Sequence, residues 1–332
     1  MKKLAALALV SAVVVVALTS CTTPPATPDT SRRSTGLTLA EAKTVVTAFE
    51  SRQVAPQKAI AASADLKAAL DVLKTDRIDA FPATVGWLET QSGYDALALK
   101  AQILLAWGEA ELTVAEVMAQ TATQLEQNLR GWEVRKNLSD ADKKKIASEK
   151  ERIDIYRETD EALRLLAAEH VGQGAEDADK VIGEKPGDYV GYRIAADAAR
   201  LRNQWTDFTA NVAKVEAAKP DSNGLKFLRG VEAYMRDGDA REAAQHFREA
   251  LAADPEFVRA QAQLVLVAPN VFEQHKELMS LKKIAPDHQI VRWAGPGIEL
   301  AHTAARERQQ AIQNAITSRP SGGTTNSATN PN

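Results

Sequence analysis

Prolines recur at a nearly constant interval in the second half of the chain, and this spacing is the strongest constraint on its fold. Pro186, Pro220 and Pro255 are 34 and 35 residues apart, and each follows a segment with apolar residues at helical spacing. Proline is common just after the C-terminus of a helix because it cannot continue the helix. A period of this length holds two helices. The spacing therefore predicts a row of helix pairs.

The rest of the chain also has a helical pattern. It is rich in alanine, the strongest helix former, and has only 17 glycines and 13 prolines in 332 residues. Capping boxes at Thr38–Glu41 and Ser139–Asp142 predict helices that extend to about Ser51 and over 143–169. Apolar spacing predicts further helices over 58–74, 94–112 and 114–129, with a break at Gly172-Gln173-Gly174. No sustained alternation indicates a sheet, so we expect an all-α fold.

The segment from Gly224 to Pro255 resembles a tetratricopeptide (TPR) repeat. Phe227 stands at the early aromatic position, Gly238-Asp239 at the turn and Pro255 at the end. Further matches are Ala233-Tyr234, Ala243, Phe247 and Ala250. The resemblance is specific over about 190–286 and weaker on either side of the best unit. It implies a TPR-like helix-pair solenoid over 171–286, an irregular N-terminal helical region over 37–170 and a capping helix within 287–317, following the break at 295–297.

The N-terminus carries a charged start, Lys2-Lys3, and an uncharged apolar run that ends in Leu18-Thr19-Ser20-Cys21. The run is too short to span a bilayer and fits a signal peptide. The quartet resembles the lipobox of bacterial lipoproteins, and Cys21 is the only cysteine of the chain. The resemblance implies that residues 1–20 are removed and that Cys21 receives lipid, including an N-acyl chain such as palmitate. The alternative is an ordinary secretory signal or membrane anchor with an incidental cysteine.

The residues beside the cysteine predict where the protein resides. Thr22, rather than Asp, follows Cys21, and this resembles lipoproteins sorted to the Gram-negative outer membrane. Residues 21–36 are rich in Thr, Pro and Ser and are expected to form a flexible tether that reaches roughly 45 Å. Residues 318–332 have the same character and are expected to be disordered. We therefore expect a lipid-anchored protein of the outer membrane that faces the periplasm.

Composition and motifs exclude several classes of chemistry. One cysteine rules out disulfide staples and Cys-cluster metal sites, and a formal net charge of -3 argues against nucleic-acid binding. The five histidines show no HExxH spacing and no phosphate-binding or nucleophile motif appears, so we expect no metal, cofactor or enzymatic activity. One enzymatic alternative remains. Glu50-Ser51 resembles the catalytic Glu-Ser of lytic transglycosylases, which are cell-wall hydrolases with a helical solenoid.

The TPR resemblance also implies a binding surface. Stacked helix pairs curve so that the first helix of each pair lines a concave groove, which can seat a peptide strand or a partner helix. The resemblance places these residues in the groove: Arg193, Asp197, Arg200, Leu225, Leu228, Glu232, Met235 and Arg236. The alternative for them is a solvated face with scattered charges. We expect a protein-binding scaffold or adaptor in envelope assembly; the alternative is an accessory component of a periplasmic ligand-binding or transport system.

Overall fold

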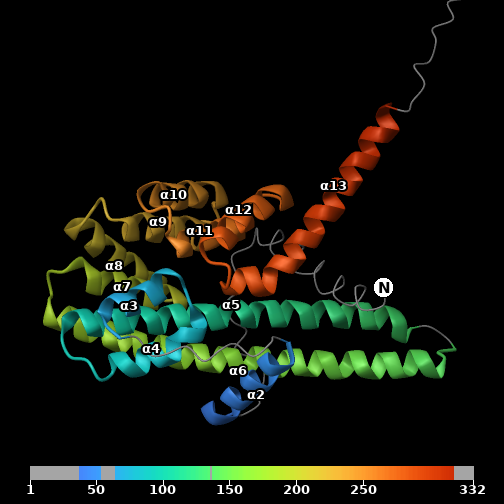
Figure 1. Cartoon of the computed structure of the whole chain (residues 1–332), viewed down its shortest axis with the longest axis horizontal. Helices are drawn as coiled ribbons and strands as arrows, with labels where there is room; N and C mark the ends of the chain where they lie inside the picture. Colours follow the sequence, from blue (N-terminus) through green and yellow to red (C-terminus); the bar gives the residue numbers. More distant parts are fainter. Residues whose placement is uncertain (1–36, 54–63, 135–136, 318–332) are drawn as a thin grey trace, which may run out of the picture.

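The computed structural model describes residues 37–53, 64–134 and 137–317. Over these residues the chain is all-helical and has no strand, as predicted (Figure 1). The lipobox, the tether and the C-terminal tail lie outside them. In chain order the elements are α2 Leu39–Gln53, α3 Leu66–Lys74, η1 Ile78–Ala80, α4 Phe81–Leu88, α5 Tyr94–Glu133, α6 Asp140–Glu184, α7 Tyr189–Leu201, α8 Trp205–Ala218, α9 Asn223–Met235, α10 Ala240–Ala253, α11 Val258–Val267, α12 Val271–Ile284, η2 Ile290–Ala294 and α13 Gly295–Thr317.

A long antiparallel hairpin of α5 and α6 forms the base of the molecule (Figure 1). Its helices have 40 and 45 residues, so α5 is about 60 Å long at 1.5 Å per residue. Two glycines let the helices approach closely. A Cβ on Gly108 would lie 2.6 Å from Cγ2 of Val171, and one on Gly174 would lie 2.8 Å from Cδ2 of Leu105. The shorter helices pack on this base, α2 against α6 and both α3 and α4 against α5.

Two predicted interruptions of these helices are wrong. The expected break near Thr113 is absent, since its hydroxyl donates to the Glu109 carbonyl at 2.9 Å and is satisfied inside one continuous helix. The expected break at Gly172–Gly174 is also absent, and α6 crosses the predicted boundary at residue 171. Gly174 is buried against Leu105, and this packing outweighs the cost of about 1 kcal/mol for glycine in a helix.

Both capping boxes are confirmed, and a third cap shortens a predicted helix. Thr38 and Glu41 exchange hydrogen bonds at the start of α2, and Ser139 and Asp142 do so at the start of α6. The helix predicted over 58–74 begins only at Leu66, where the Asp65 carboxylate accepts the N–H of Ala68 at 2.8 Å. Residues 58–63 lie outside the described part of the chain.

The predicted row of helix pairs is present as three consecutive hairpins, α7–α8, α9–α10 and α11–α12. One type of turn precedes α7, α9, α11 and η2. At Pro220, for example, the Lys219 N–H donates to the Val215 carbonyl at 2.8 Å, and the Ser222 N–H donates to the Lys219 carbonyl at 3.2 Å. The same two bonds recur around Pro186, Pro255 and Pro286. Four prolines therefore mark four equivalent turns, as the sequence period indicated for three of them.

The turns inside the hairpins follow local chemistry. Gly238 has a φ of +71°, and the Asp239 carboxylate caps α10 by accepting the N–H groups of Arg241 and Glu242. Asn203 takes the left-handed conformation in the α7–α8 turn, with a φ of +57°. Asparagine is among the few non-glycine residues that tolerate this region. The turn predicted at Gly238-Asp239 is confirmed.

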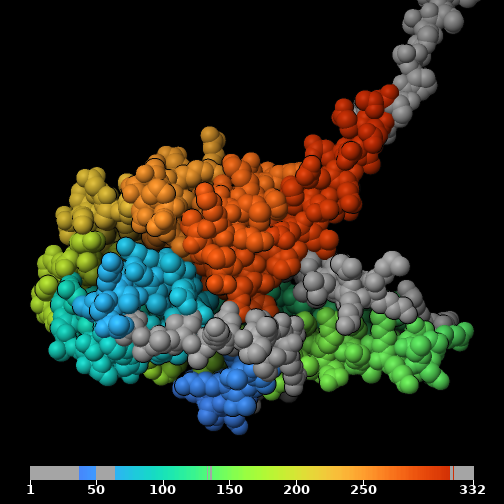
Figure 2. Space-filling view, in the orientation of Figure 1, coloured from blue at the N-terminus to red at the C-terminus, as the bar shows by residue number. Residues whose placement is uncertain are grey.

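The C-terminal part returns over the base and then leaves it. The three hairpins start at one end of the α5–α6 hairpin and curve back above α5, and a π-helical turn, η2, contacts α5 (Figure 1). The break predicted at 295–297 is wrong: the π-helical turn η2 runs directly into α13, which includes Pro296. The outer part of α13 projects from the body, and residues 306–314 are all exposed (Figure 2).

The close approach of α5 and α6 predicts the effect of a larger side chain. In Gly108→Val the new methyl groups meet Val171 and the Ala167 carbonyl oxygen, which a Cβ alone would approach to 3.1 Å. Overpacking of this kind costs about 1–3 kcal/mol, which urea unfolding followed by circular dichroism will measure. Gly172→Ala, with nothing within 4 Å of its Cβ, is the control. It should raise the unfolding free energy by about 0.5–1 kcal/mol. Equal effects of the two changes would contradict the packing argument.

Candidate functional site

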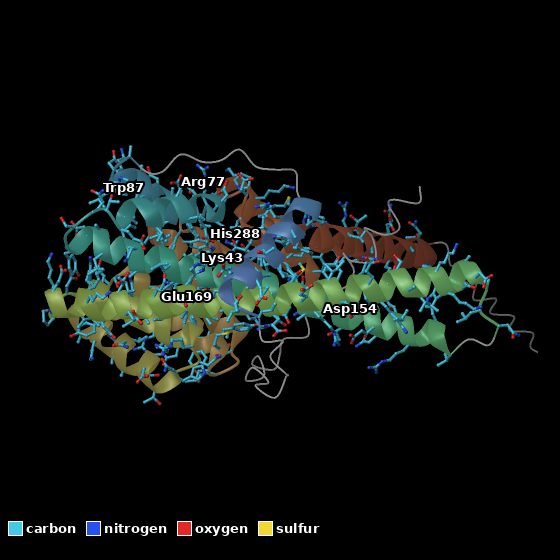
Figure 3. All side chains as sticks on the ribbon, turned by 90° about the horizontal axis from the view of Figure 1, so that it is seen from below. Lys43, Arg77, Trp87, Asp154, Glu169 and His288 are labelled. Atoms are coloured by element: carbon cyan, nitrogen blue, oxygen red, sulfur yellow. The ribbon has the colours of Figure 1, made fainter. Side chains whose placement is uncertain are left out.

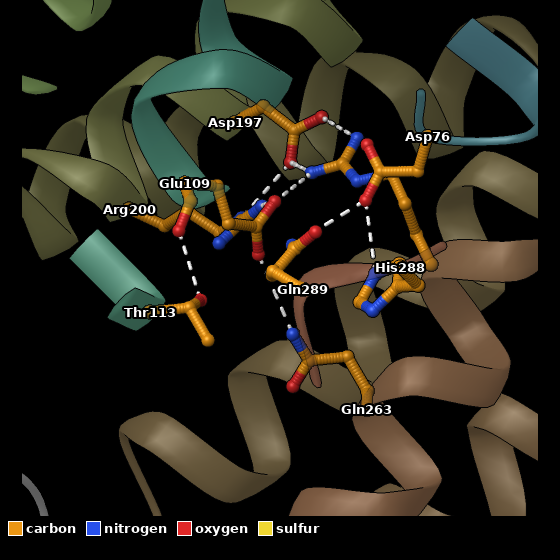
Figure 4. Close-up of polar contacts among 9 residues, drawn as sticks. Asp76, Glu109, Thr113, Asp197, Arg200, Gln263, His288 and Gln289 are labelled. Carbon is orange, nitrogen blue, oxygen red and sulfur yellow. Dashed lines mark hydrogen bonds and ion pairs between the residues drawn. The ribbon is translucent and has the colours of Figure 1, made fainter. Parts of the chain in front are cut away.

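A buried quartet of charged side chains joins α5 to the row of hairpins (Figure 4). Glu109 of α5 accepts hydrogen bonds from Arg200 of α7 and Arg259 of α11, both at 2.7 Å. Asp197 of α7 accepts from the same two arginines, at 2.9 and 3.1 Å. The ring of Phe227 lies 5.8 Å from the Arg200 guanidinium and 5.0 Å from that of Arg259. The two carboxylates and two guanidiniums balance in charge.

The quartet stays ionised because its members compensate one another. Burial by itself raises the pKa of Glu109, but Arg200 and Arg259 outweigh it and lower that pKa to about 2. The Asp197 pKa is likewise held below its usual range, because the attraction of these arginines exceeds the penalty of burial. For Arg259 burial lowers the pKa, but Asp197 and Glu109 more than compensate and raise it. Removing any one member therefore leaves an uncompensated charge among the other three.

A second polar contact fixes η2 to the N-terminal part of the molecule. Asp76, between α3 and η1, is buried with a φ of +51°, and its Oδ2 lies 2.9 Å from Nε2 of His288. His288 lies near the middle of the molecule (Figure 3) and is 2% exposed. Its Nδ1 accepts the N–H of Ile290 at 3.1 Å, so we assign the proton to Nε2, which donates to Asp76.

A small hollow lies between the quartet and the Asp76–His288 contact. It has a volume of about 20 Å³ and is lined by Glu109, Arg259, Gln263, His288 and Gln289, among others. This volume suits one water molecule rather than an organic ligand. The interior network is thus a structural joint that holds three distant segments together.

The groove residues predicted on α7 lie at this joint. Asp197 and Arg200 belong to the quartet, and Arg193 hydrogen-bonds Gln102 of α5. The side chain of Arg200 is only 8% exposed. These three residues share one face of α7, and α5 of the same chain packs on that face.

The groove residues predicted on α9 are divided between core and surface. Leu225 and Leu228 are buried in the core around Phe227, and Met235 packs against the same core. Glu232 is buried and held by Arg229 at 2.6 Å and Arg236 at 2.5 Å. Arg236 is exposed. The eight predicted residues therefore do not share one open face.

An open groove, here called the outer groove, lies between α8 and α10, and three of the eight predicted groove residues line it. It has a volume of about 530 Å³, with α9 as its floor, α8 as one wall and α10 as the other. Leu225, Glu232 and Arg236 line it together with Glu216, Pro220, Lys226, Arg229, Ala233, Asp237, Glu242, His246 and Glu249. The polar stripe of Glu242, His246 and Glu249 on α10, at i, i+4 and i+7, is the sequence signal that indicates this wall.

The remaining candidate chemistry has limited structural support. His170 lies 2.8 Å from Glu111 between α5 and α6 and stacks on Trp107, so it is a buried packing residue. Within the described ranges no three His, Cys, Asp or Glu side chains are placed to hold a metal ion. No helix of the described chain is long and apolar enough to cross a membrane. Cys21 and the side chain of Glu50, on which the hydrolase alternative depends, lie outside what the structure describes.

The lowered pKa of Glu109 predicts acid sensitivity. An unfolded glutamate titrates near pH 4.3, whereas Glu109 in the folded chain titrates near 2. Between these values the unfolded state binds more protons, so stability falls as the pH falls. This residue alone contributes up to about 1.4 kcal/mol per pH unit. In Glu109→Gln, the unfolding free energy measured between pH 4 and 2.5 should depend less steeply on pH.

The same variant should be destabilised at neutral pH. Glu109→Gln leaves two arginines facing one carboxylate, a loss of about 3 kcal/mol for a broken buried pair. Glu256→Gln removes an exposed carboxylate from the α10–α11 turn and is the control. An unchanged pH slope in Glu109→Gln, or an equal change in the control, would disprove the role of the quartet.

Comparisons with known proteins do not assign the chain to a family. No protein-family model matches it, and a search of curated proteins found no match either.

Proposed function

We propose that the chain is an envelope-anchored scaffold that binds a protein partner on a row of TPR-like helix pairs. The observation that carries this proposal is the open groove of about 530 Å³ between α8 and α10. Its floor is preorganised, because the arginines of α9 are already held by carboxylates in fixed positions. A preorganised surface loses little side-chain freedom when a partner binds.

The TPR-like assignment is supported by the recurrence of one turn type at 31- to 35-residue intervals, at Pro186, Pro220, Pro255 and Pro286. It is further supported by the packing in the best-matched unit. The ring centroids of Phe227 and Phe247 lie 5.7 Å apart, and a Cβ on Gly230 would lie 2.6 Å from the Phe247 ring. The contact between the two rings is the one expected from the aromatic positions of the repeat, whereas Gly230-Val231 departs from the Leu-Gly that the family usually has there.

We place the partner in the outer groove rather than on the α7 face. On the α7 face, Gln102 and Glu109 of α5 already contact Arg193 and Arg200, so α5 occupies the position that a ligand helix would take. The outer groove contains three of the predicted residues, Leu225, Glu232 and Arg236. Its charged lining suits a protein segment, and the 20 Å³ hollow is too small for a transported organic ligand.

The envelope anchor is proposed from the sequence alone. Cys21 ends the apolar leader, and residues 21–36 would connect the lipid to α2. Several acyl chains together hold a protein on a membrane almost permanently, since each buried CH₂ contributes about 0.8 kcal/mol. We propose the periplasmic face of the outer membrane as its location.

Loss of the anchor should release the protein. In Cys21→Ala the lipid acceptor is absent, so the chain is expected in the soluble fraction after cell lysis, whereas the unaltered chain sediments with membranes. Fractionation with immunoblotting measures the distribution. If the Cys21→Ala chain still sediments with membranes and keeps its leader, the lipid-anchor proposal is wrong. The uncleaved leader would then be the membrane anchor.

Site-specific cross-linking tests the scaffold. A photoreactive amino acid at Lys226 or Glu242, on the floor and wall of the groove, should capture the same envelope protein in living cells. The control position is Glu158, which is exposed on α6 away from the groove. Mass spectrometry identifies the captured chain. Capture of nothing at either groove position, or of the same proteins at Glu158, would count against the scaffold function.

A further inference from the structure

We infer that the groove between α8 and α10 takes an extended, cationic segment of the partner, with two lysines or arginines three residues apart. The inference rests on the proposed scaffold function and adds the chemistry of the segment. It is based on three observations: the arginines of the groove are paired with carboxylates of the chain, two further carboxylates have no lysine or arginine partner within 4 Å in the described part of the chain, and these two are seven residues apart on α10.

The arginines on the floor of the groove are already engaged. Arg229 lies 2.6 Å from Glu216 of α8 and 2.6 Å from Glu232. Arg236 lies 2.5 Å from Glu232 and 2.8 Å from Asp237. An acidic ligand would have to compete with these carboxylates for both arginines, so the floor does not favour one.

The α10 wall carries the carboxylates that are least compensated. Glu242 and Glu249 are 57% and 45% exposed, and their nearest basic group is His246 between them, at 3.8 and 3.4 Å. The pKa of Glu249 is lowered by a hydrogen bond from Gln245 and, to a smaller extent, by His246 and Lys226. Glu249 is therefore an ionised acceptor at neutral pH.

The net charge of the residues that line the groove also favours a cationic ligand. Three cations, Lys226, Arg229 and Arg236, face five carboxylates, so the groove carries an excess of two negative charges. The carboxylates are Glu216, Glu232, Asp237, Glu242 and Glu249. A segment with two positive side chains neutralises this excess.

Spacing along the wall sets the spacing in the ligand. Glu242 and Glu249 are seven residues apart on a helix, which corresponds to about 10.5 Å. A chain in the polyproline II conformation advances about 3.1 Å per residue with three residues per turn. Side chains at i and i+3 then lie on one side, about 9.3 Å apart. The long side chains of lysine and arginine cover the remaining difference.

Binding of a defined peptide to the purified full chain tests the inference. The probe is a fluorescein-labelled peptide, Pro-Lys-Pro-Pro-Lys-Pro, and fluorescence anisotropy at low salt measures its dissociation constant. Replacing both lysines of the peptide by glutamate should abolish binding. Moving the lysines next to each other should weaken it.

Two matched double variants locate the site. Glu242→Gln with Glu249→Gln should weaken binding of the lysine peptide by about fivefold or more, the loss expected for two exposed ion pairs. Glu158→Gln with Glu256→Gln removes the same charge from exposed positions outside the groove and should leave the dissociation constant unchanged. Circular dichroism checks that both variants are folded.

The outcomes separate the two proposals. Equal affinities of the two double variants, no binding by the unaltered chain, or binding of the glutamate peptide would overturn the cationic-segment inference. The scaffold proposal would survive each of these results if Lys226 and Glu242 still capture one partner specifically. If neither groove position captures a partner specifically, the scaffold proposal is wrong, whatever the result of the peptide-binding measurement.

Discussion

The buried quartet of Glu109, Asp197, Arg200 and Arg259 is the interaction on which the arrangement of this molecule depends. Glu109 contacts residues that follow it by 91 and 150 positions in the chain, so one side chain holds both the first and the third hairpin against α5. A buried ion pair adds little net stability over an apolar contact of the same shape. Its effect is selective, because a packing that separated Glu109 from Arg200 and Arg259 would leave these two arginines facing only one carboxylate.

The inner face of the hairpins is closed in this way by α5. The arginines and aspartate of α7 have the residue types of a ligand-binding face, but they are paired within the chain. Arg193 and Arg200 contact α5, and Asp197 contacts Arg200 and Arg259. The outer side of the hairpins keeps an open groove whose charges are only partly paired. The same type of helix pair thus provides an internal joint on one side and, on the other, the open groove where we propose that a partner binds.

Local signals in the sequence were sufficient for most elements of the fold. The caps at Thr38 and Ser139, the turn at Gly238-Asp239 and the prolines after the hairpins depend on residues a few positions apart, so they could be predicted. The predicted breaks at Thr113 and Gly172–Gly174 failed for a different reason. Glycine weakens a helix in isolation, but Gly174 lies in the contact between two long helices, where the lack of a side chain permits the close packing.

The sequence by itself determined that this chain is helical, that its second half consists of paired helices, and where their turns lie. These properties follow from hydrogen bonds and backbone preferences within single helices and turns. Only the tertiary structure decided which faces of those helices are open. Arg193, Asp197 and Arg200 are polar in any fold. They became internal because Gln102 and Glu109 of α5 meet the two arginines, and Arg259 of α11 meets Asp197. The outer groove depends equally on how α8 and α10 flank α9, a relation between segments that no local pattern contains.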